Sequence, residues 1–77
     1  MKLKVKYFGM LAEVTGTAEE DWATEATTVG ELVSEIVRAY PMLDDNVFQV
    51  AQQQELTTLD ADLNSGEVAL LPPFSGG

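Results

Sequence analysis

One stretch near the middle of the chain has the pattern of a single amphipathic helix, and it limits the folds open to the other residues. Thr28 and Glu31 have the spacing of a capping box, in which each side chain accepts a hydrogen bond from the other residue's backbone amide. Pro41 disfavours helical geometry at Tyr40 and so predicts the end of the helix. Between these signals, apolar residues recur with the helical period: Val29, Leu32, Val33, Ile36, Val37 and Tyr40. This stripe predicts a helix packed on a core and does not indicate a cofactor site.

The residues before this helix have the pattern of two strands. Leu3, Val5 and Tyr7 alternate with lysines, which is typical of a strand with one buried face and one exposed face. A short helical turn or an ordered loop is expected after this strand. Residues 19–25 are mostly polar and acidic, with Trp22 as their apolar anchor. We expect them to form an edge strand that pairs back on the first strand, with Trp22 covering the core or the edge.

The residues after the helix predict further strands. Residues 47–51 read as a strand, and a polar connection punctuated by leucines follows it. In this connection Asp60 and Asp62 are expected to be solvated, because two carboxylates without a third ligand are weak evidence for a metal site. Residues 68–71 are apolar without alternation, which is typical of a strand buried on both faces. The order of elements is therefore strand, strand, helix, one or more strands, and a last central strand.

A small mixed sheet with one main helix packed on one face accounts for this order. A chain of 77 residues has room for one small core. The first and last strands are the best-patterned ones, so we place them side by side and parallel. The sequence thus predicts an α+β protein of the β-grasp, or ubiquitin-like, class. It is divided into a domain at residues 1–71 and an extended arm at residues 72–77.

The composition removes several classes of function. Without cysteine or histidine, the chain lacks thiol nucleophiles, thiolate metal ligands and the usual general base near neutral pH. Its net charge of −9 disfavours nucleic acid or an anionic membrane as a partner and favours a basic protein surface, although acidity can also serve only to keep a small domain in solution. No apolar run approaches the roughly 20 residues of a membrane span, and no secretory signal is visible. We expect a cytoplasmic protein.

The sequence of residues 72–77 predicts an extended arm that carries a reactive group to another protein. The two prolines fix φ and cannot extend the ladder of the preceding strand, so the arm would leave in a stiff direction. The diglycine end carries no side chain, which suits a reactive carboxylate at Gly77 that enters a narrow active site. The alternative is a frayed polar terminus, with Phe74 covering its own domain. The residues expected to bind a partner are Pro72, Pro73, Phe74, Ser75 and Gly76.

Two motifs at the ends of the chain resemble a known family. The first is Val5-Lys6-Tyr7-Phe8, followed by Leu11, Glu13 and Gly16-Thr17, and the second is Glu67-Val68-Ala69-Leu70-Leu71-Pro72-Pro73-Phe74-Ser75-Gly76-Gly77. Together with the Thr28-Val29 helix entry, they resemble the small, sulfur-carrying subunit of molybdopterin synthase, a ubiquitin-like β-grasp family. The two prolines before the terminal diglycine are the specific part of the resemblance, because a diglycine alone would be a weak signal.

The resemblance implies a carrier that is not catalytic alone and that binds no cofactor or metal. A ubiquitin-activator-like adenylating enzyme would use ATP to convert the Gly77 carboxylate to an acyl adenylate, and a sulfur donor would convert that to a thiocarboxylate. The large subunit of the synthase would then receive the tail, and sulfur would pass to a pyranopterin precursor of the molybdenum cofactor. The absence of cysteine fits this chemistry, because it leaves the terminal carboxylate as the distinctive place to load sulfur.

Three other functions remain open at this point. The first is a related sulfur carrier for thiamine thiazole or tungsten-cofactor synthesis. The second is a ubiquitin-like modifier whose Gly77 forms an isopeptide bond with a lysine. The third is a β-grasp adaptor without chemistry, since this scaffold hosts all of these functions.

Overall fold

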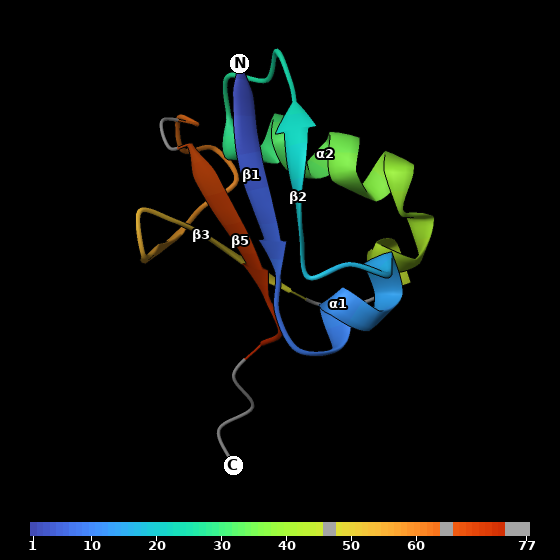
Figure 1. The fold of residues 1–77 in the computed structure, drawn as a ribbon. Coiled ribbons are helices and arrows are strands. Elements are labelled where there is room, and N and C mark those ends of the chain that lie inside the picture. The colour runs from blue at the N-terminus through green and yellow to red at the C-terminus, as the bar shows by residue number, and fades with distance from the viewer. Residues whose placement is uncertain (46–47, 64–65, 74–77) are drawn as a thin grey trace.

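The computed structural model describes residues 1–45, 48–63 and 66–73. It contains two α-helices, one short 3-10 helix (η1) and five strands (Figure 1). In chain order the elements are β1 (Lys2–Tyr7), α1 (Met10–Thr15), β2 (Glu19–Ala23), α2 (Val29–Ala39), η1 (Pro41–Asp45), β3 (Gln49–Gln52), β4 (Glu55–Thr57) and β5 (Glu67–Leu71).

The five strands form one mixed sheet in the order β2-β1-β5-β3-β4. β1 and β5 are parallel, with Val5 opposite Val68 and Tyr7 opposite Leu70, and every other neighbouring pair is antiparallel. The long helix α2 packs across one face of this sheet (Figure 1). The β-grasp prediction is therefore confirmed, including the edge position of β2 and the central position of β5.

The main helix begins where the capping box predicts. The Thr28 hydroxyl accepts from the Glu31 amide at 3.2 Å, and the Glu31 carboxylate accepts from the Thr28 amide at 3.2 Å. The loop after β4 satisfies two more amides of the first turn, because Val29 donates to the Ala61 carbonyl and Gly30 donates to that of Leu59. A Cβ at Gly30 would lie 2.9 Å from the Leu59 oxygen. Only glycine allows this loop to approach the helix so closely.

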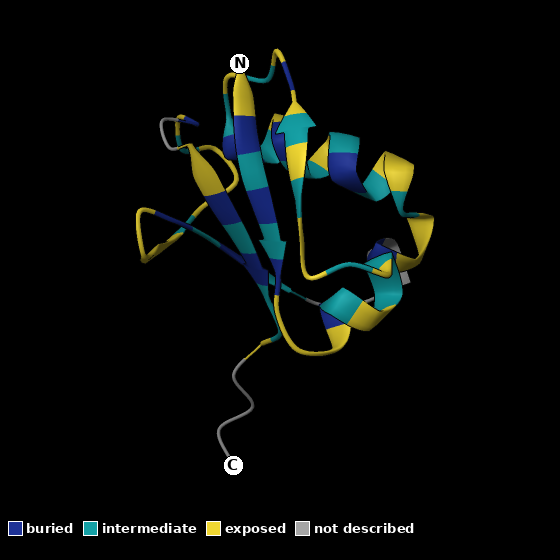
Figure 2. Cartoon of the chain, in the orientation of Figure 1, coloured by how far each residue is buried: buried dark blue, intermediate teal, exposed yellow. Residues whose placement is uncertain are grey.

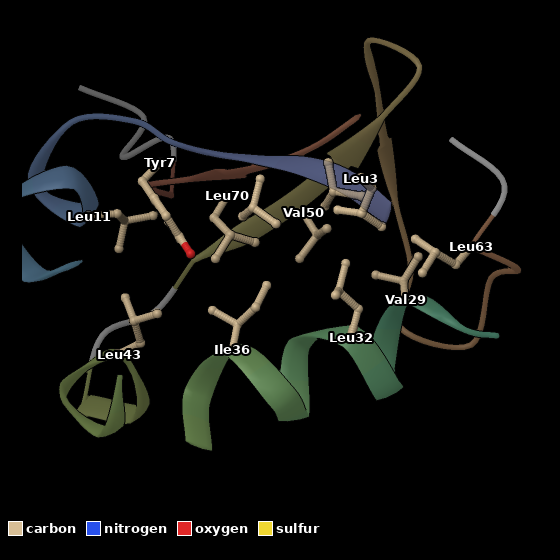
Figure 3. Packing of buried hydrophobic residues seen from close by; sticks show 12 residues of the cluster. Leu3, Tyr7, Leu11, Val29, Leu32, Ile36, Leu43, Val50, Leu63 and Leu70 are labelled. Carbon is tan, nitrogen blue, oxygen red and sulfur yellow. The ribbon is translucent and has the colours of Figure 1, made fainter. Parts of the chain in front are cut away.

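The core lies between α2 and one face of the sheet (Figure 3). The side chains of alternate β1 and β5 residues meet the apolar stripe of α2 there, and α1 and η1 contribute one leucine each. The buried apolar residues are Leu3, Val5, Tyr7, Leu11, Val29, Leu32, Ile36, Leu43, Val50, Leu63, Val68 and Leu70.

Two carboxylates tie the edge strand β2 to this core. Glu20 accepts from the Tyr7 hydroxyl at 2.6 Å and from the Tyr40 hydroxyl at 2.8 Å. Burial, together with the bond to Glu20, raises the pKa of Tyr7. Glu35 on α2 accepts from the Trp22 indole at 3.1 Å, and Trp22 packs against the core. The expectation that Trp22 covers the core edge is confirmed.

The region after β3 differs from the sequence-based expectation. We expected a polar connection there, but Glu55–Thr57 forms strand β4, which pairs with β3 as a hairpin. The turn consists of Gln53 and Gln54, which both have positive φ, at 55° and 64°. This is the backbone of a tight hairpin turn that usually contains Asn or Gly, so the sequence carries no strong signal for it. The start of the strand predicted at 47–51 also shifts, because β3 begins at Gln49 and residue 47 lies outside the described residues.

Candidate functional site

The face of the sheet opposite α2, which we call the open face, carries apolar side chains from β5. We predicted that residues 68–71 would be buried on both faces, and this prediction is wrong. Val68 and Leu70 point into the core and are fully buried, but Ala69 and Leu71 point to the open face and are half-buried. Figure 2 shows this alternation as bands of buried and intermediate colour along β5. The helix covers only one face of the sheet, so an apolar run here marks a surface and not a second core.

The open face is hollowed into a shallow groove of about 410 Å³. Strand pairing places Lys6, Ala69, Ala51 and Leu56 in one row across four neighbouring strands, β1, β5, β3 and β4. Leu56 is 57% exposed and Phe8, just after β1, is 45% exposed, so two large apolar side chains of this groove are in contact with water. This groove, which we call the apolar groove, is lined by Lys6, Phe8, Ala51, Leu56, Ala69 and Leu71, and also by Gln52, Gln53, Gln54 and Glu67.

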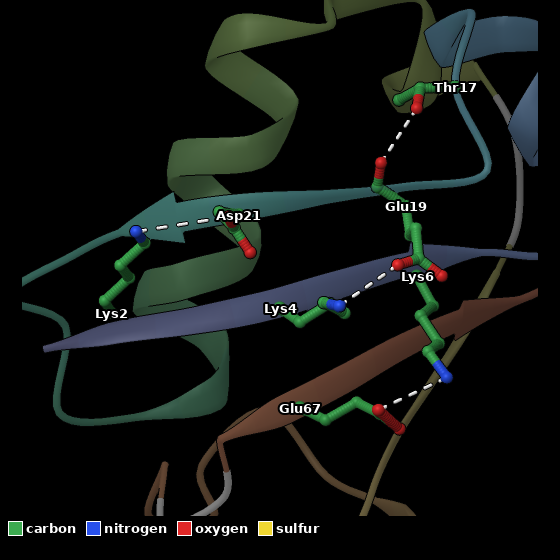
Figure 4. A network of polar contacts seen from close by, with 7 residues as sticks. All are labelled: Lys2, Lys4, Lys6, Thr17, Glu19, Asp21 and Glu67. Carbon is green, nitrogen blue, oxygen red and sulfur yellow. Dashed lines mark hydrogen bonds and ion pairs between the residues drawn. The ribbon is translucent and has the colours of Figure 1, made fainter.

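Of the three lysines of β1, Lys6 lines the groove, and each lysine is close to a carboxylate of a neighbouring strand (Figure 4). The hydrogen bond from the Lys4 ammonium to Glu19 raises the pKa of Lys4. These pairs leave the strongly acidic chain with little concentrated positive charge on the open face. The pairs are Lys2 with Asp21 at 4.0 Å, Lys4 with Glu19 at 3.1 Å and Lys6 with Glu67 at 3.2 Å.

The predicted arm begins at the end of this groove. β5 ends at Leu71, which lines the groove, and the next two residues are Pro72, which is half-buried, and Pro73, which is exposed. The structure thus brings the first two predicted partner-binding residues next to the apolar groove. The remaining predicted site residues lie outside the described part of the chain: Phe74, Ser75, Gly76 and Gly77.

Sequence reasoning missed the groove itself. Phe8 was noted only as part of a motif, and Leu56 was assigned to a polar connection. The available signal was the unbroken apolar run of β5 in a chain with only one main helix, since one helix can cover only one face of the sheet. Ala69 and Leu71 in that run therefore had to lie on an uncovered face or meet another protein.

Two other features of the described residues offer less for chemistry. No group of three or more Asp or Glu side chains able to hold a metal ion occurs in the described ranges. Asp60 and Asp62 are both exposed, and the bond from the Thr58 hydroxyl lowers the pKa of Asp60.

A second groove, of about 540 Å³, lies between Val33 of α2 and the β3–β4 hairpin, and its lining contains no residue of β1, β5 or the prolines. Among the described helices, none is long and apolar enough to cross a membrane.

Comparisons with known proteins agree with the fold and cover the whole chain. The model of the ThiS family matches residues 5–77. The molybdopterin synthase sulfur carrier subunits of Chlamydomonas reinhardtii and Mycobacterium tuberculosis are 34% and 35% identical to this chain. Both alignments cover 100% of this chain, and they cover 100% of the Chlamydomonas protein and 99% of the Mycobacterium protein. Among solved structures, small archaeal modifier protein 1 of Haloferax volcanii is 31% identical, with a TM-score of 0.80 over 100% of both chains. The chain therefore belongs to the ThiS family of small β-grasp proteins, which confirms the resemblance to the sulfur carrier subunits of molybdopterin synthase.

Proposed function

We propose that this chain is a sulfur carrier for molybdopterin synthesis and that its C-terminal arm is loaded and unloaded by partner proteins that dock on the open face. The observation that carries the proposal is the continuity between the apolar groove and the arm: Leu71 lines the groove, and Pro72 and Pro73 follow it directly. A protein bound in the groove would hold the start of the arm. The full-length similarity to two sulfur carrier subunits supports the same function.

The proposed chemistry takes place at the carboxylate of Gly77. An adenylating partner transfers AMP from ATP to this carboxylate and releases pyrophosphate. Hydrosulfide supplied by a donor then attacks the acyl carbon and displaces AMP, which leaves a thiocarboxylate. On the large synthase subunit the sulfur bonds to the pyranopterin precursor, and water then cleaves the acyl–sulfur bond, which restores the carboxylate. In this proposal ATP binds the activating partner, and this chain supplies only the arm and the docking face.

The partner surface that fits the groove is apolar at its centre and basic around it. The centre must match Phe8, Leu56 and Leu71, and the net charge of −9 on this chain attracts a basic rim. Both proposed partners bind anions, ATP in one case and a pterin phosphate in the other, so basic surroundings suit their own ligands as well. We propose that the two partners use the same groove in turn and that this exchange takes place in the cytoplasm.

The test is the intact mass of the full chain after incubation with ATP, a sulfide source and candidate adenylating enzymes from the same cell. We expect one terminal oxygen to be replaced by sulfur, and we expect the change to reverse when the large synthase subunit and the pterin precursor are added. Gly76→Val should stay folded and remain unloaded. The control is Gly66→Val, because the Cβ position at Gly66 is open. Normal loading of Gly76→Val would contradict entry of the tail into a narrow site.

Three alternative functions remain, and assays of sulfur loading and of covalent conjugation separate them. If sulfur is loaded but only a thiazole-forming or tungsten-cofactor system removes it, the carrier belongs to that pathway, as a match to the ThiS family allows. The similarity to a small archaeal modifier protein favours the second alternative, a modifier joined to lysines. Covalent conjugates that disappear when Gly76 and Gly77 are deleted would support that function. Absence of loading and conjugation would leave an adaptor.

A further inference from the structure

Gly9 lies beside Pro72, the first residue of the arm, and its backbone conformation and its contact with the proline ring are both unusual. Gly9 has φ 57° and ψ −135°, a backbone conformation that residues with a side chain rarely adopt. A Cβ at Gly9 would lie 2.9 Å from Cγ of Pro72 and 3.7 Å from its Cδ. The proline ring therefore occupies the space that a side chain at Gly9 would need.

The backbone around Gly9 is held on both sides of this contact. On the sheet side, the Phe8 amide donates to the Leu70 carbonyl at 3.1 Å and extends the pairing of β1 with β5 by one residue. On the helix side, the Gly9 carbonyl accepts from the Ala12 amide at 3.2 Å in the first turn of α1. Leu11 anchors that turn in the core, where it is fully buried. The Pro72 ring thus rests on a backbone segment that neighbouring elements fix in place.

We propose that Gly9 and Pro72 form a seat that sets the direction in which the arm leaves the sheet. If the proposed function holds, this seat makes Gly9 a positioning residue for sulfur loading, although Gly9 lies far from Gly77 in the sequence. A tilt of about 10° at the base of an extended six-residue chain moves its end by roughly 3 Å. Misplacement of reacting groups by only about 1 Å can lower a rate roughly a hundredfold. A small displacement of the Pro72 ring therefore has a large effect at the reactive end.

The chain supplies a matched control at the other end of α1. Gly16 also has positive φ, at 82°, but no atom lies within 4 Å of its Cβ position. Gly16→Ala and Gly9→Ala both place a side chain at positive φ, in the αL region at Gly16 and with ψ −135° at Gly9, and only Gly9→Ala also displaces the Pro72 ring. Pro72→Ala removes the ring atoms, so the double variant Gly9→Ala/Pro72→Ala keeps the strain and relieves the clash.

The direction of the arm can be measured without any partner. Because the chain has no cysteine, spin labels can be attached at Ser34→Cys, on the exposed side of α2, and at Ser75→Cys in the arm. We expect Gly16→Ala to leave the distance distribution between the labels unchanged and Gly9→Ala to shift or broaden it. In the Pro72→Ala background, Gly9→Ala should cause no further change. An equal effect of Gly9→Ala in both backgrounds, or no effect in either, would overturn the proposal.

If Gly9→Ala does not fold, Pro72→Ala alone provides the test. The seat requires a narrower distribution in the wild type than in Pro72→Ala, and equal widths would contradict it.

The second readout is the kinetics of adenylation of the full chain by its activating enzyme. Since the groove is intact in Gly9→Ala, we expect KM to stay within about twofold and kcat to fall roughly ten- to a hundredfold. Gly16→Ala should retain both values, and a parallel loss in Gly16→Ala would show that Gly9→Ala acts only through stability. If no enzyme loads the wild type, the proposed function fails while the label distances still decide whether the seat exists.

Discussion

The two faces of the sheet carry apolar side chains from the same strands, but α2 covers only one of them. Along β5, the neighbours Leu70 and Leu71 are chemically identical, yet Leu70 is fully buried in the core while Leu71 lines the apolar groove. Within one strand, hydrophobicity thus serves two purposes. Side chains on the covered face stabilise the fold, and side chains on the open face are available to bind another protein.

The largest expected effect contrasts these two leucines. Leu70→Ala should lower the free energy of unfolding by about 2 to 5 kcal/mol, because it removes buried methyl groups and leaves a cavity. Leu71→Ala should cost about 1 kcal/mol or less, since part of that side chain is already in contact with water. Urea denaturation of both variants measures the difference. Equal losses would show that the open face stabilises the domain as the covered face does.

The second prediction contrasts two leucines with the same exposure. Leu56 and Leu59 are both 57% exposed, but Leu56 lines both grooves, whereas Leu59 lines only the second groove. Leu56→Asp should weaken binding of the adenylating enzyme or the large synthase subunit roughly tenfold or more, about 1.4 kcal/mol, and Leu59→Asp should leave it within about twofold. Titration calorimetry with the purified partner gives both values. A loss of binding in Leu59→Asp as large as that in Leu56→Asp would indicate that the partner docks in the second groove, which both leucines line.

The third prediction concerns the contact between α2, the helix that covers the sheet, and the loop after β4. Gly30→Ala should destabilise the fold by about 1 to 2 kcal/mol, because the new methyl group would clash with the Leu59 carbonyl oxygen. The cost of this clash should exceed the gain from the higher helix propensity of alanine. Gly66→Ala is the control, since its Cβ position is open. Thermal unfolding of both variants measures the effect. Stabilisation by Gly30→Ala would mean that the loop shifts away from α2 at no cost.

The smallest effect depends on pH and also acts at the start of α2. The Thr27 amide, followed by the Thr27 hydroxyl and the Thr28 amide, donates to the Glu31 carboxylate and lowers the pKa of Glu31 below its ordinary 4.5. Because the folded-state pKa is the lower one, this contribution to stability is present above pH 4.5 and is lost as the pH falls through the folded-state value.

Glu31→Gln should therefore reduce stability at neutral pH and make its decline towards acid pH less steep. Urea midpoints of wild type and variant, measured from neutral pH down to acid pH, follow the change. Glu55→Gln, on the exposed strand β4, serves as the comparison. If the urea midpoint of Glu31→Gln fell with acid pH as steeply as that of the wild type, the capping carboxylate would not be a source of the pH dependence.

The parts of the fold that sequence predicted are those set by local chemistry. The side chains of Thr28 and Glu31 form the capping box by themselves, and alternation around Val5 defines a strand wherever it is placed. The hairpin at Gln53 and Gln54 escaped prediction because its positive φ values arise from the pairing of β3 with β4. Glutamine has no preference for that conformation, so only the tertiary structure reveals it.

The candidate site was predictable at the arm and not at the groove. The Pro-Pro and Gly-Gly pairs restrict or free the backbone whatever surrounds them, so the arm could be read directly from the sequence. The groove requires the strand order, because Lys6, Ala51, Leu56 and Ala69 are adjacent only through three strand pairings. The contact between Gly9 and Pro72 likewise depends on the parallel pairing of β1 with β5.

The hydrogen bond between Trp22 and Glu35 allows unfolding of the domain and binding at the apolar groove to be followed by separate fluorescence signals. Trp22 is the only tryptophan in the chain, and it packs on the helix side, where its indole donates to a carboxylate of α2. Its fluorescence should therefore change when α2 separates from the sheet and remain nearly constant when a tryptophan-free partner occupies the apolar groove. One intrinsic chromophore thus monitors unfolding with little interference from binding, and a dye attached near Leu56 would monitor binding alone.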